Sequence, residues 1–260
     1  MTRLDRELRD LRDRRRALVP YFMAGLTPNW TQYLDAAVQG GADVLEVGVP
    51  FSDPMMDGPV IQAAGVRALE RGVTLEGVLD ELARTDLGVP VVVMTYFNVM
   101  HYRGLERAAG LLARAGVAGV ILPDLSLEES APWRRAAGAR DLATILMVAP
   151  STPPDRVARI VATSQGFVYA AARMAVTGRA SGDGEAARVV AGIREHGDVP
   201  VYVGIGISAP DQARHATRDA DGVIVGSALV QRVLDGESPA ELETLISRFR
   251  RTIDEGAPEA

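Results

Sequence analysis

The chain has 260 residues, of which 47% are apolar and only 5% aromatic, and its formal net charge is -6. A chain of this length can bury roughly three quarters of its unfolded surface, which suits one large α/β domain. The acidic balance argues against nucleic-acid binding, which needs a basic face. Because the sequence has no cysteine and no lysine, thiol catalysis and Schiff-base chemistry are both excluded.

The first 17 residues have the pattern of an amphipathic helix. Leu4, Leu8 and Leu11 recur at helical spacing, so a helix over residues 1–17 is expected to dock on the rest of the fold. Its acidic residues argue against a mitochondrial targeting segment. No secretory signal is recognisable, and no apolar run approaches the ~18 residues of a membrane span. A cytoplasmic protein without membrane contact is therefore expected.

Short runs rich in β-branched residues alternate with segments of helical periodicity. The expected strands cover residues 18–23, 44–49, 89–95, 119–122, 143–148, 166–169, 201–204 and 222–225. Helical segments are expected at residues 30–40, 61–71, 105–115, 155–163, 185–196, 209–217 and 239–252. This alternation predicts a parallel sheet with right-handed crossovers, and eight such units indicate a closed (β/α)8 TIM barrel.

The predicted architecture is one TIM-barrel domain over residues 1–260, with an extra N-terminal helix. An open doubly wound sheet is the alternative fold. That fold usually carries a glycine-rich loop after its first strand, whereas residues 24–28 read Ala-Gly-Leu-Thr-Pro, which is no dinucleotide-binding fingerprint.

Candidate catalytic residues follow from the barrel, whose active sites lie at the carboxyl ends of the strands. Glu46 lies within the apolar second strand and shares a face with Val44 and Gly48, which is expected to point inward. A buried carboxylate costs several kcal/mol unless it is paired or functional. Glu46 is thus either an acid–base group or a structural partner of an arginine on another strand.

The loop after the second strand carries two further acids, Asp53 and Asp57, among prolines and glycines. Either acid alone is more typical of a turn residue, because aspartate side chains cap turns. A catalytic role gains weight because this loop leaves the strand that carries Glu46.

Glycines follow the last three strands, at Gly178, Gly204, Gly206 and Gly226. In barrels the loops after strands seven and eight commonly hold phosphate, using backbone N–H groups and a short helix N-terminus. Residues 228–234 are expected to form that helix. Tight turns without a ligand are the alternative. The three histidines are too far apart in the sequence for a metal-ligand motif.

Together these segments resemble the alpha subunits of tryptophan synthase over nearly the whole chain. The strongest stretch is residues 46–62. Supporting segments are residues 19–21, 94–98, 122–129, 166–169, 176–178, 204–208 and 226–228.

The resemblance implies retro-aldol cleavage of indole-3-glycerol phosphate to indole and glyceraldehyde 3-phosphate, with no metal or organic cofactor. By position, Glu46 matches the proton-transferring glutamate and Asp57 the indole-binding aspartate. Matches to phosphate-binding positions are Gly178, Gly206, Gly226 and Ser227, and matches to pocket-lining positions are Tyr96 and Tyr169. A tryptophan synthase beta subunit is the implied partner.

The sequence departs from the family pattern at four places: Met23, Ala175, Val99 and Ser126. Alanine at 175 would be strained if that position needs a positive φ. Val99 and Ser126 replace frequent prolines, in loops that the resemblance places near the beta-subunit contact. Three alternatives therefore stay open: a stand-alone lyase that releases indole, a non-catalytic activator of a beta subunit, and a phosphosugar isomerase.

Overall fold

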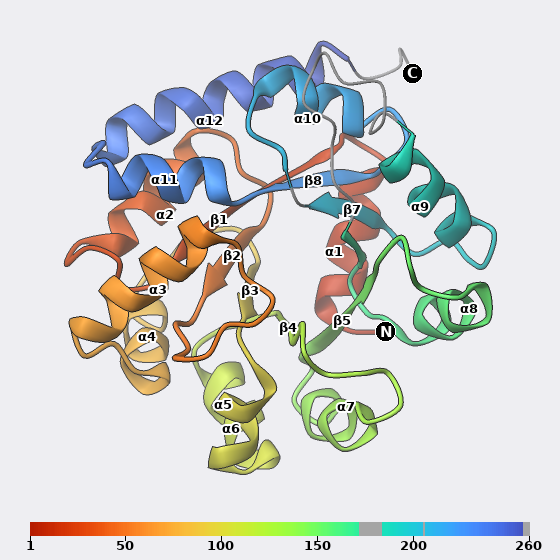
Figure 1. Ribbon diagram of the computed structural model, residues 1–260, viewed down its shortest axis with the longest axis horizontal. Coiled ribbons are helices and arrows are strands. Elements are labelled where there is room, and N and C mark those ends of the chain that lie inside the picture. The colour runs from red at the N-terminus through yellow and green to blue at the C-terminus, as the bar shows by residue number, and fades with distance from the viewer. Residues whose placement is uncertain (172–183, 205, 257–260) are drawn as a thin grey trace.

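The computed structural model describes residues 1–171, 184–204 and 206–256. Eight parallel strands close into a barrel in chain order, with β1 hydrogen-bonded to both β2 and β8 (Figure 1). They are β1 (Ala17–Met23), β2 (Leu45–Gly48), β3 (Val91–Met94), β4 (Gly119–Ile121), β5 (Ala143–Val148), β6 (Val168–Ala171), β7 (Val201–Gly204) and β8 (Gly222–Val225). The expected TIM barrel is confirmed, and the pairing of β1 with β8 excludes an open doubly wound sheet.

Helices surround the strands (Figure 1). They are α1 (Arg3–Arg12), α2 (Trp30–Gln39), α3 (Pro59–Glu70), α4 (Leu75–Leu82), α5 (Phe97–Arg103), α6 (Leu105–Arg114), α7 (Ala131–Gly138), α8 (Pro154–Thr163), α9 (Glu185–Arg194), α10 (Pro210–Ala216), α11 (Ser227–Leu234) and α12 (Pro239–Asp254). Three of these helices, α4, α5 and α7, lie outside the helical segments expected from the sequence.

The N-terminal helix is shorter than the expected 1–17. A capping box of Thr2 and Asp5 starts α1, and the helix ends at Arg12 because the N–H groups of Arg14 and Arg15 both turn back to the carbonyl of Leu11. Ala17 already belongs to β1, where it pairs with Gly222. The prediction of a helix over the last five residues was therefore wrong.

The docking of this helix was predicted correctly. Leu4 and Leu8 are fully buried and belong to the same apolar cluster as the inward side chains of the barrel. A Cβ atom added at Gly119 or Gly166 would lie within 2.9 Å of Leu4, so these two glycines make room for it. The helix α1 therefore packs against the interior of the barrel and helps to fill it.

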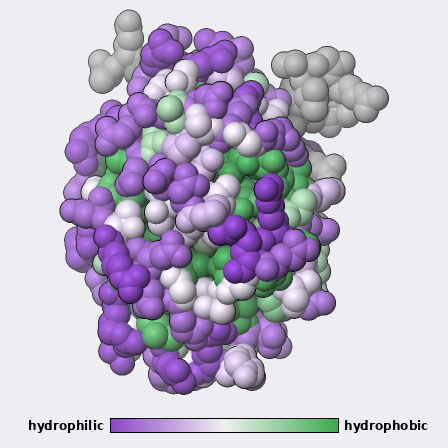
Figure 2. Space-filling view, turned by 90° about the vertical axis from the view of Figure 1, so that its left-hand side faces the viewer, coloured by the Kyte–Doolittle hydropathy of each residue, from purple (hydrophilic) through white to green (hydrophobic). Residues whose placement is uncertain are grey.

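Side chains on the outward faces of the strands pack against the surrounding helices. Leu18, Val47 and Val93 share an apolar cluster with helix residues such as Leu34 and Ala64. Hydrophilic residues cover most of the molecular face shown in Figure 2, with smaller hydrophobic areas between them. None of the described helices is long and apolar enough to cross a membrane.

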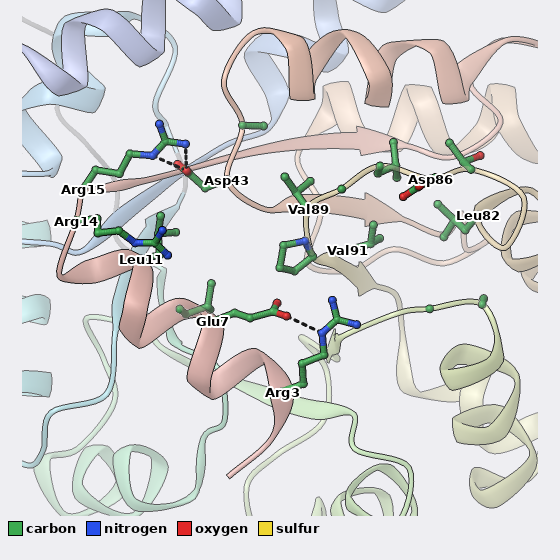
Figure 3. A pocket seen from close by; sticks show the side chains of 18 residues that line it. Arg3, Glu7, Leu11, Arg14, Arg15, Asp43, Leu82, Asp86, Val89 and Val91 are labelled. Atoms are coloured by element: carbon green, nitrogen blue, oxygen red, sulfur yellow. Dashed lines mark hydrogen bonds and ion pairs between the residues drawn. The ribbon is translucent and has the colours of Figure 1, made fainter.

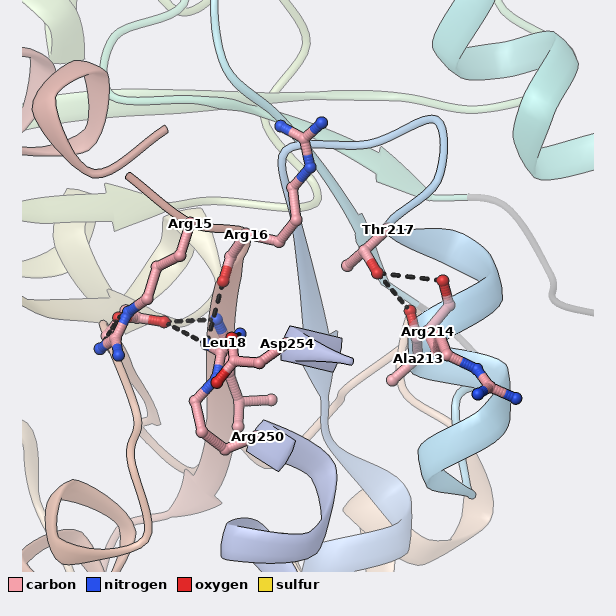
Figure 4. A network of polar contacts seen from close by, with 9 residues as sticks. Arg15, Arg16, Leu18, Ala213, Arg214, Thr217, Arg250 and Asp254 are labelled. Atoms are coloured by element: carbon pink, nitrogen blue, oxygen red, sulfur yellow. Dashed lines mark hydrogen bonds and ion pairs between the residues drawn. The ribbon is translucent and has the colours of Figure 1, made fainter. Parts of the chain in front are cut away.

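A buried ion-pair network joins the last helix to the start of the barrel (Figure 4). The Asp43 carboxylate accepts hydrogen bonds from the backbone N–H of Leu18 and from the guanidinium groups of Arg15 and Arg250. Arg250 also donates to the carbonyl of Arg16 and to Asp254. This network ties α12 to the segment that enters β1 and to Asp43, two residues before β2.

Removing Arg250 should destabilise the fold, because Asp43 is only 2% exposed at its side chain and loses a cationic partner. We expect Arg250→Ala to lower the free energy of unfolding by about 3 kcal/mol, the scale for breaking a buried pair. Arg251→Ala, at an exposed position of the same helix, should cost less than about 0.5 kcal/mol. Equal losses in urea denaturation would contradict this account of the network.

Candidate active site

A cavity of about 690 Å³ lies at the carboxyl ends of the strands. Its lining residues come from the strand ends and from the loops that follow them: Tyr21, Glu46, Met56, Asp57, Gly58, Ile61, Met94, Pro123, Met147, Pro150, Tyr169, Ala171, Glu185, Gly206, Ile207, Ile224, Gly226 and Ser227. Both acids singled out in the sequence, Glu46 and Asp57, therefore face one cavity. Asp53 does not line it; this residue is exposed and accepts a hydrogen bond from Ser52, as a turn residue would.

A second hollow, of about 550 Å³, lies between α1 and the segment that enters β3 (Figure 3). It borders the amino ends of the strands, where barrels place residues for stability rather than catalysis. Four of its charged groups are paired, Arg3 with Glu7 at 2.6 Å and Arg15 with Asp43. We therefore place the candidate active site in the cavity around Glu46.

Glu46 occupies an inward position of β2, in register between Tyr21 of β1 and Val92 of β3. The residue is 2% exposed, and its Oε2 atom is buried without a hydrogen-bond partner. No ion pair to an arginine is found for it within the described ranges. The alternative expectation, a structural ion pair between Glu46 and an arginine, is therefore not observed among the described residues.

The surroundings of Glu46 favour its protonated form. Burial raises the pKa of the carboxyl group to about 8, and the negative charge of Asp57 adds to the increase. Buried acids with raised pKa values are typical of proton-transferring groups, because they hold a proton near neutral pH.

Asp57 lies in the loop between β2 and α3. Gly58, the N-cap residue of α3, separates it from the first residue of that helix. Burial raises the pKa of Asp57 to about 6, while a hydrogen bond from the Tyr96 hydroxyl acts in the opposite direction. At neutral pH, Asp57 is therefore mostly ionised while Glu46 is mostly protonated. Of this pair, Asp57 can therefore accept hydrogen bonds and Glu46 can donate a proton.

Tyr96 supports the loop rather than lining the cavity. Its hydroxyl oxygen accepts the backbone N–H of Met56 at 2.9 Å, and its ring stacks on Phe51 with centroids 5.0 Å apart. The side chain is buried, and it is not among the lining residues. It reaches the cavity through its hydrogen bond to Asp57.

Two tyrosines form part of the inner wall. The hydroxyl of Tyr21 lies against Gly48, where a Cβ atom would be 2.0 Å away, and the hydroxyl of Tyr169 lies against Gly204 in the same way, at 2.1 Å. Burial raises the pKa of both phenols well above 10, with the charges of Glu46 and Asp57 adding to it. Both phenols therefore stay neutral donors.

Sequence reasoning assigned no role to Tyr21. The signal was present in the two-residue alternation of β1, in which Ala17, Val19 and Tyr21 share one face. Which face points inward follows only from the register, which sets Tyr21 beside Glu46.

The far end of the cavity is rich in backbone N–H groups. Gly206 has a φ of +81°, a conformation that glycine adopts without strain. Gly226 precedes α11, and Ser227 is its first residue, so the first N–H groups of this helix have no acceptor within it. Gly178 and Ala175 lie outside the described residues.

The arrangement suits a molecule with a flat apolar group at one end and an anion at the other. Ile61, Met94, Met147 and Ile224 give apolar walls near the acids. Backbone N–H groups at a helix start bind phosphate well. Among the described residues, no group of three or more His, Asp or Glu side chains is placed to hold a metal ion.

Comparison with known proteins points to one family. The family model described as tryptophan synthase alpha chain matches residues 8–255. An alpha chain from Streptomyces coelicolor is 48% identical over 87% of this chain and 85% of its own length, and one from Laribacter hongkongensis is 42% identical over 98% and 100%.

Solved structures agree in fold. Tryptophan synthase subunit alpha from Legionella pneumophila superposes with a TM-score of 0.89 at 34% identity, covering 98% of this chain and 99% of that one. Tryptophan synthase from Mycobacterium tuberculosis gives 0.89 at 39% identity, covering 97% and 98%. These matches favour the main interpretation of the sequence over its three alternatives. The chain belongs to the tryptophan synthase alpha chain family and is a carbon–carbon lyase of the indole-3-glycerol-phosphate aldolase type.

Proposed function

We propose that this protein binds indole-3-glycerol phosphate in the cavity and cleaves it with Glu46 and Asp57 to indole and glyceraldehyde 3-phosphate. The observation that carries the proposal is the acid pair itself: a buried carboxyl group with a pKa of about 8 and a second with a pKa of about 6 line one cavity. Family membership supports the reaction, and the residue roles are those that the resemblance implies and that the chemistry of cleavage explains.

Cleavage starts with a proton on indole C3. Protonated Glu46 gives its proton to C3, and positive charge develops on the ring nitrogen. The ionised Asp57 accepts the indole N–H and stabilises that charge. The Glu46 carboxylate then takes the proton of the hydroxyl group on C3′, the C3–C3′ bond breaks, its electron pair restores the indole ring, and C3′ becomes the aldehyde carbon.

The other end of the substrate carries the phosphate. We assign it to the N–H groups around Gly206, Gly226 and Ser227, with Gly178 as a further candidate. The indole ring would lie between the apolar walls, and Tyr169 would line the pocket that holds it. The chain contains no lysine, and no arginine is among the described lining residues, so backbone dipoles would supply most of the attraction.

Removal of either acid should abolish most of the cleavage. We expect Glu46→Gln and Asp57→Asn each to lower kcat/KM by at least about 100-fold, the scale of an essential acid–base group. Release of indole from indole-3-glycerol phosphate is the measurement. Circular dichroism and thermal melting serve as folding controls, and near-wild-type turnover of a folded variant would reject the assigned role.

The two pKa values predict a bell-shaped pH dependence. Activity requires ionised Asp57 and protonated Glu46, so kcat/KM should rise as pH increases through about 6 and fall as it increases through about 8. Replacing Tyr96 by Phe removes the hydrogen bond that lowers the pKa of Asp57, so the acidic limb should move to higher pH. An unchanged acidic limb in Tyr96→Phe would contradict the assignment of that limb to Asp57.

We further propose a tryptophan synthase beta subunit as partner, in line with the solved tryptophan synthase structures that this chain resembles. On the segments that follow β2 and β3, the most exposed large apolar side chains are Met55, at 79%, and Tyr102, at 84%. Val99 and Ser126, which depart from the family pattern, also follow the carboxyl ends of strands. Val99 lies on α5, after β3, and Ser126 lies in the loop after β4. Indole released here could pass to a bound subunit without entering water.

A beta subunit should activate cleavage. We expect its addition to raise kcat at least about fivefold, a typical coupling between sites. Met55→Ser and Tyr102→Ser should weaken the complex while leaving cleavage by the isolated chain unchanged. Val66→Ser, at an exposed apolar position of α3, is the matched control. Full activity alone with no response to a beta subunit would instead indicate a stand-alone lyase.

A further inference from the structure

We propose that the hydroxyl of Tyr21 donates a hydrogen bond to the substrate oxygen on C3′, the atom that becomes the aldehyde oxygen. Tyr21 would then contact the reacting group directly, as a third member of the site beside the two acids. This inference rests on the proposed function, and it concerns the glycerol part of the substrate, where the oxygen on C3′ loses its proton to Glu46.

The orientation of the Tyr21 ring carries the first step. A Cβ atom at Gly226 would lie 3.7 Å from the Cβ and Cδ1 atoms of Tyr21, so the base of the ring borders the proposed phosphate end. Its hydroxyl lies against Gly48, two residues beyond Glu46 on the same inward face of β2. The ring therefore extends from the anion end to the acid pair, along the path that the three-carbon chain of the substrate must take.

Hydrogen-bonding capacity gives the second step. When Glu46 accepts the proton of the C3′ hydroxyl, the oxygen gains negative charge, and a donor is needed to stabilise it. Among the described lining side chains, the donors other than the acids are Tyr21, Tyr169 and Ser227. Ser227 belongs to the phosphate end, and the Tyr169 hydroxyl lies over β7, whereas Tyr21 is in register with Glu46.

The Tyr21 hydroxyl is also available. Within the described ranges it makes no hydrogen bond, although its residue is only 4% exposed. Burial and the charges of Asp57 and Glu46 hold its pKa well above 10, so it keeps its proton throughout the reaction. No proton is transferred to or from Tyr21. The proton of the C3′ hydroxyl goes to Glu46, and Tyr21 only donates a hydrogen bond.

The test uses two ligands in a background that cannot turn over, Glu46→Gln. One is indole-3-glycerol phosphate, and the other is the same molecule with both glycerol hydroxyl groups replaced by hydrogen. Adding Tyr21→Phe should weaken binding of the first about tenfold and leave the second unchanged, because only the first can accept the hydrogen bond. In the otherwise wild-type protein, Tyr21→Phe should lower kcat about 10- to 100-fold.

Tyr202→Phe is the matched control. Tyr202 is also a buried inward tyrosine, but it stacks on Phe167 below the cavity and does not line it, so this variant should keep wild-type turnover and ligand preference. Equal weakening of both ligands by Tyr21→Phe would indicate mere packing and overturn the inference. A wild-type kcat in Tyr21→Phe would also overturn the inference. The same holds if Tyr169→Phe, and not Tyr21→Phe, removes the preference for indole-3-glycerol phosphate over the analogue without hydroxyl groups.

Failure of the inference and failure of the proposed function are distinguishable. A wild-type protein that releases no indole contradicts the function itself. Cleavage that depends on Glu46 but not on Tyr21 contradicts only the role of Tyr21.

Discussion

Glu46 carries its carboxyl group into the interior of the barrel, where it meets apolar side chains, two tyrosines and a second acid. Within the described residues no cation compensates it, and its Oε2 atom has no partner. The resulting desolvation raises its pKa and is the source of its chemical usefulness.

The same chain shows how a structural carboxylate is treated. Asp43 and Asp221, each just ahead of a strand, are as buried as Glu46, yet each accepts a backbone N–H group of the preceding strand and pairs with arginines. These acids join strands at the amino end of the barrel. Against that standard, an acid of the same burial without a charge partner is better explained by chemistry than by architecture.

Much of the fold could be predicted from the sequence. Every strand lies within two residues of its expected position, because short runs of β-branched residues separated by helical segments admit few other folds. The helices α4, α5 and α7 were missed. α5 and α6 are separated by a single residue, Gly104, whose φ of +80° breaks a stretch that is otherwise helical, and such breaks depend on tertiary packing.

The candidate site was predicted in part, and for a physical reason. Glu46 and Asp57 stand out because an acid in an apolar strand is costly wherever the barrel puts it. The place of Tyr21 beside Glu46, and the position of Tyr96 under the loop, depend on strand register and loop geometry, which no local pattern encodes. Neutral hydrophobic-looking residues carry no such sequence signal, so their contribution appears only in three dimensions.

The described cavity lining contains no cation, and this affects both the pKa of Glu46 and the way in which the proposed site would bind phosphate. An arginine beside the acids would hold the pKa of Glu46 down, and the residue could then no longer be protonated near neutral pH. Phosphate nevertheless needs positive potential. In the proposed site, a helix N-terminus and glycine N–H groups would supply it as short-range dipoles, whose effect falls off within about one helical turn. The anion could thus be bound without a full positive charge that would lower the pKa of Glu46, and neutral phenols are donors compatible with the same requirement.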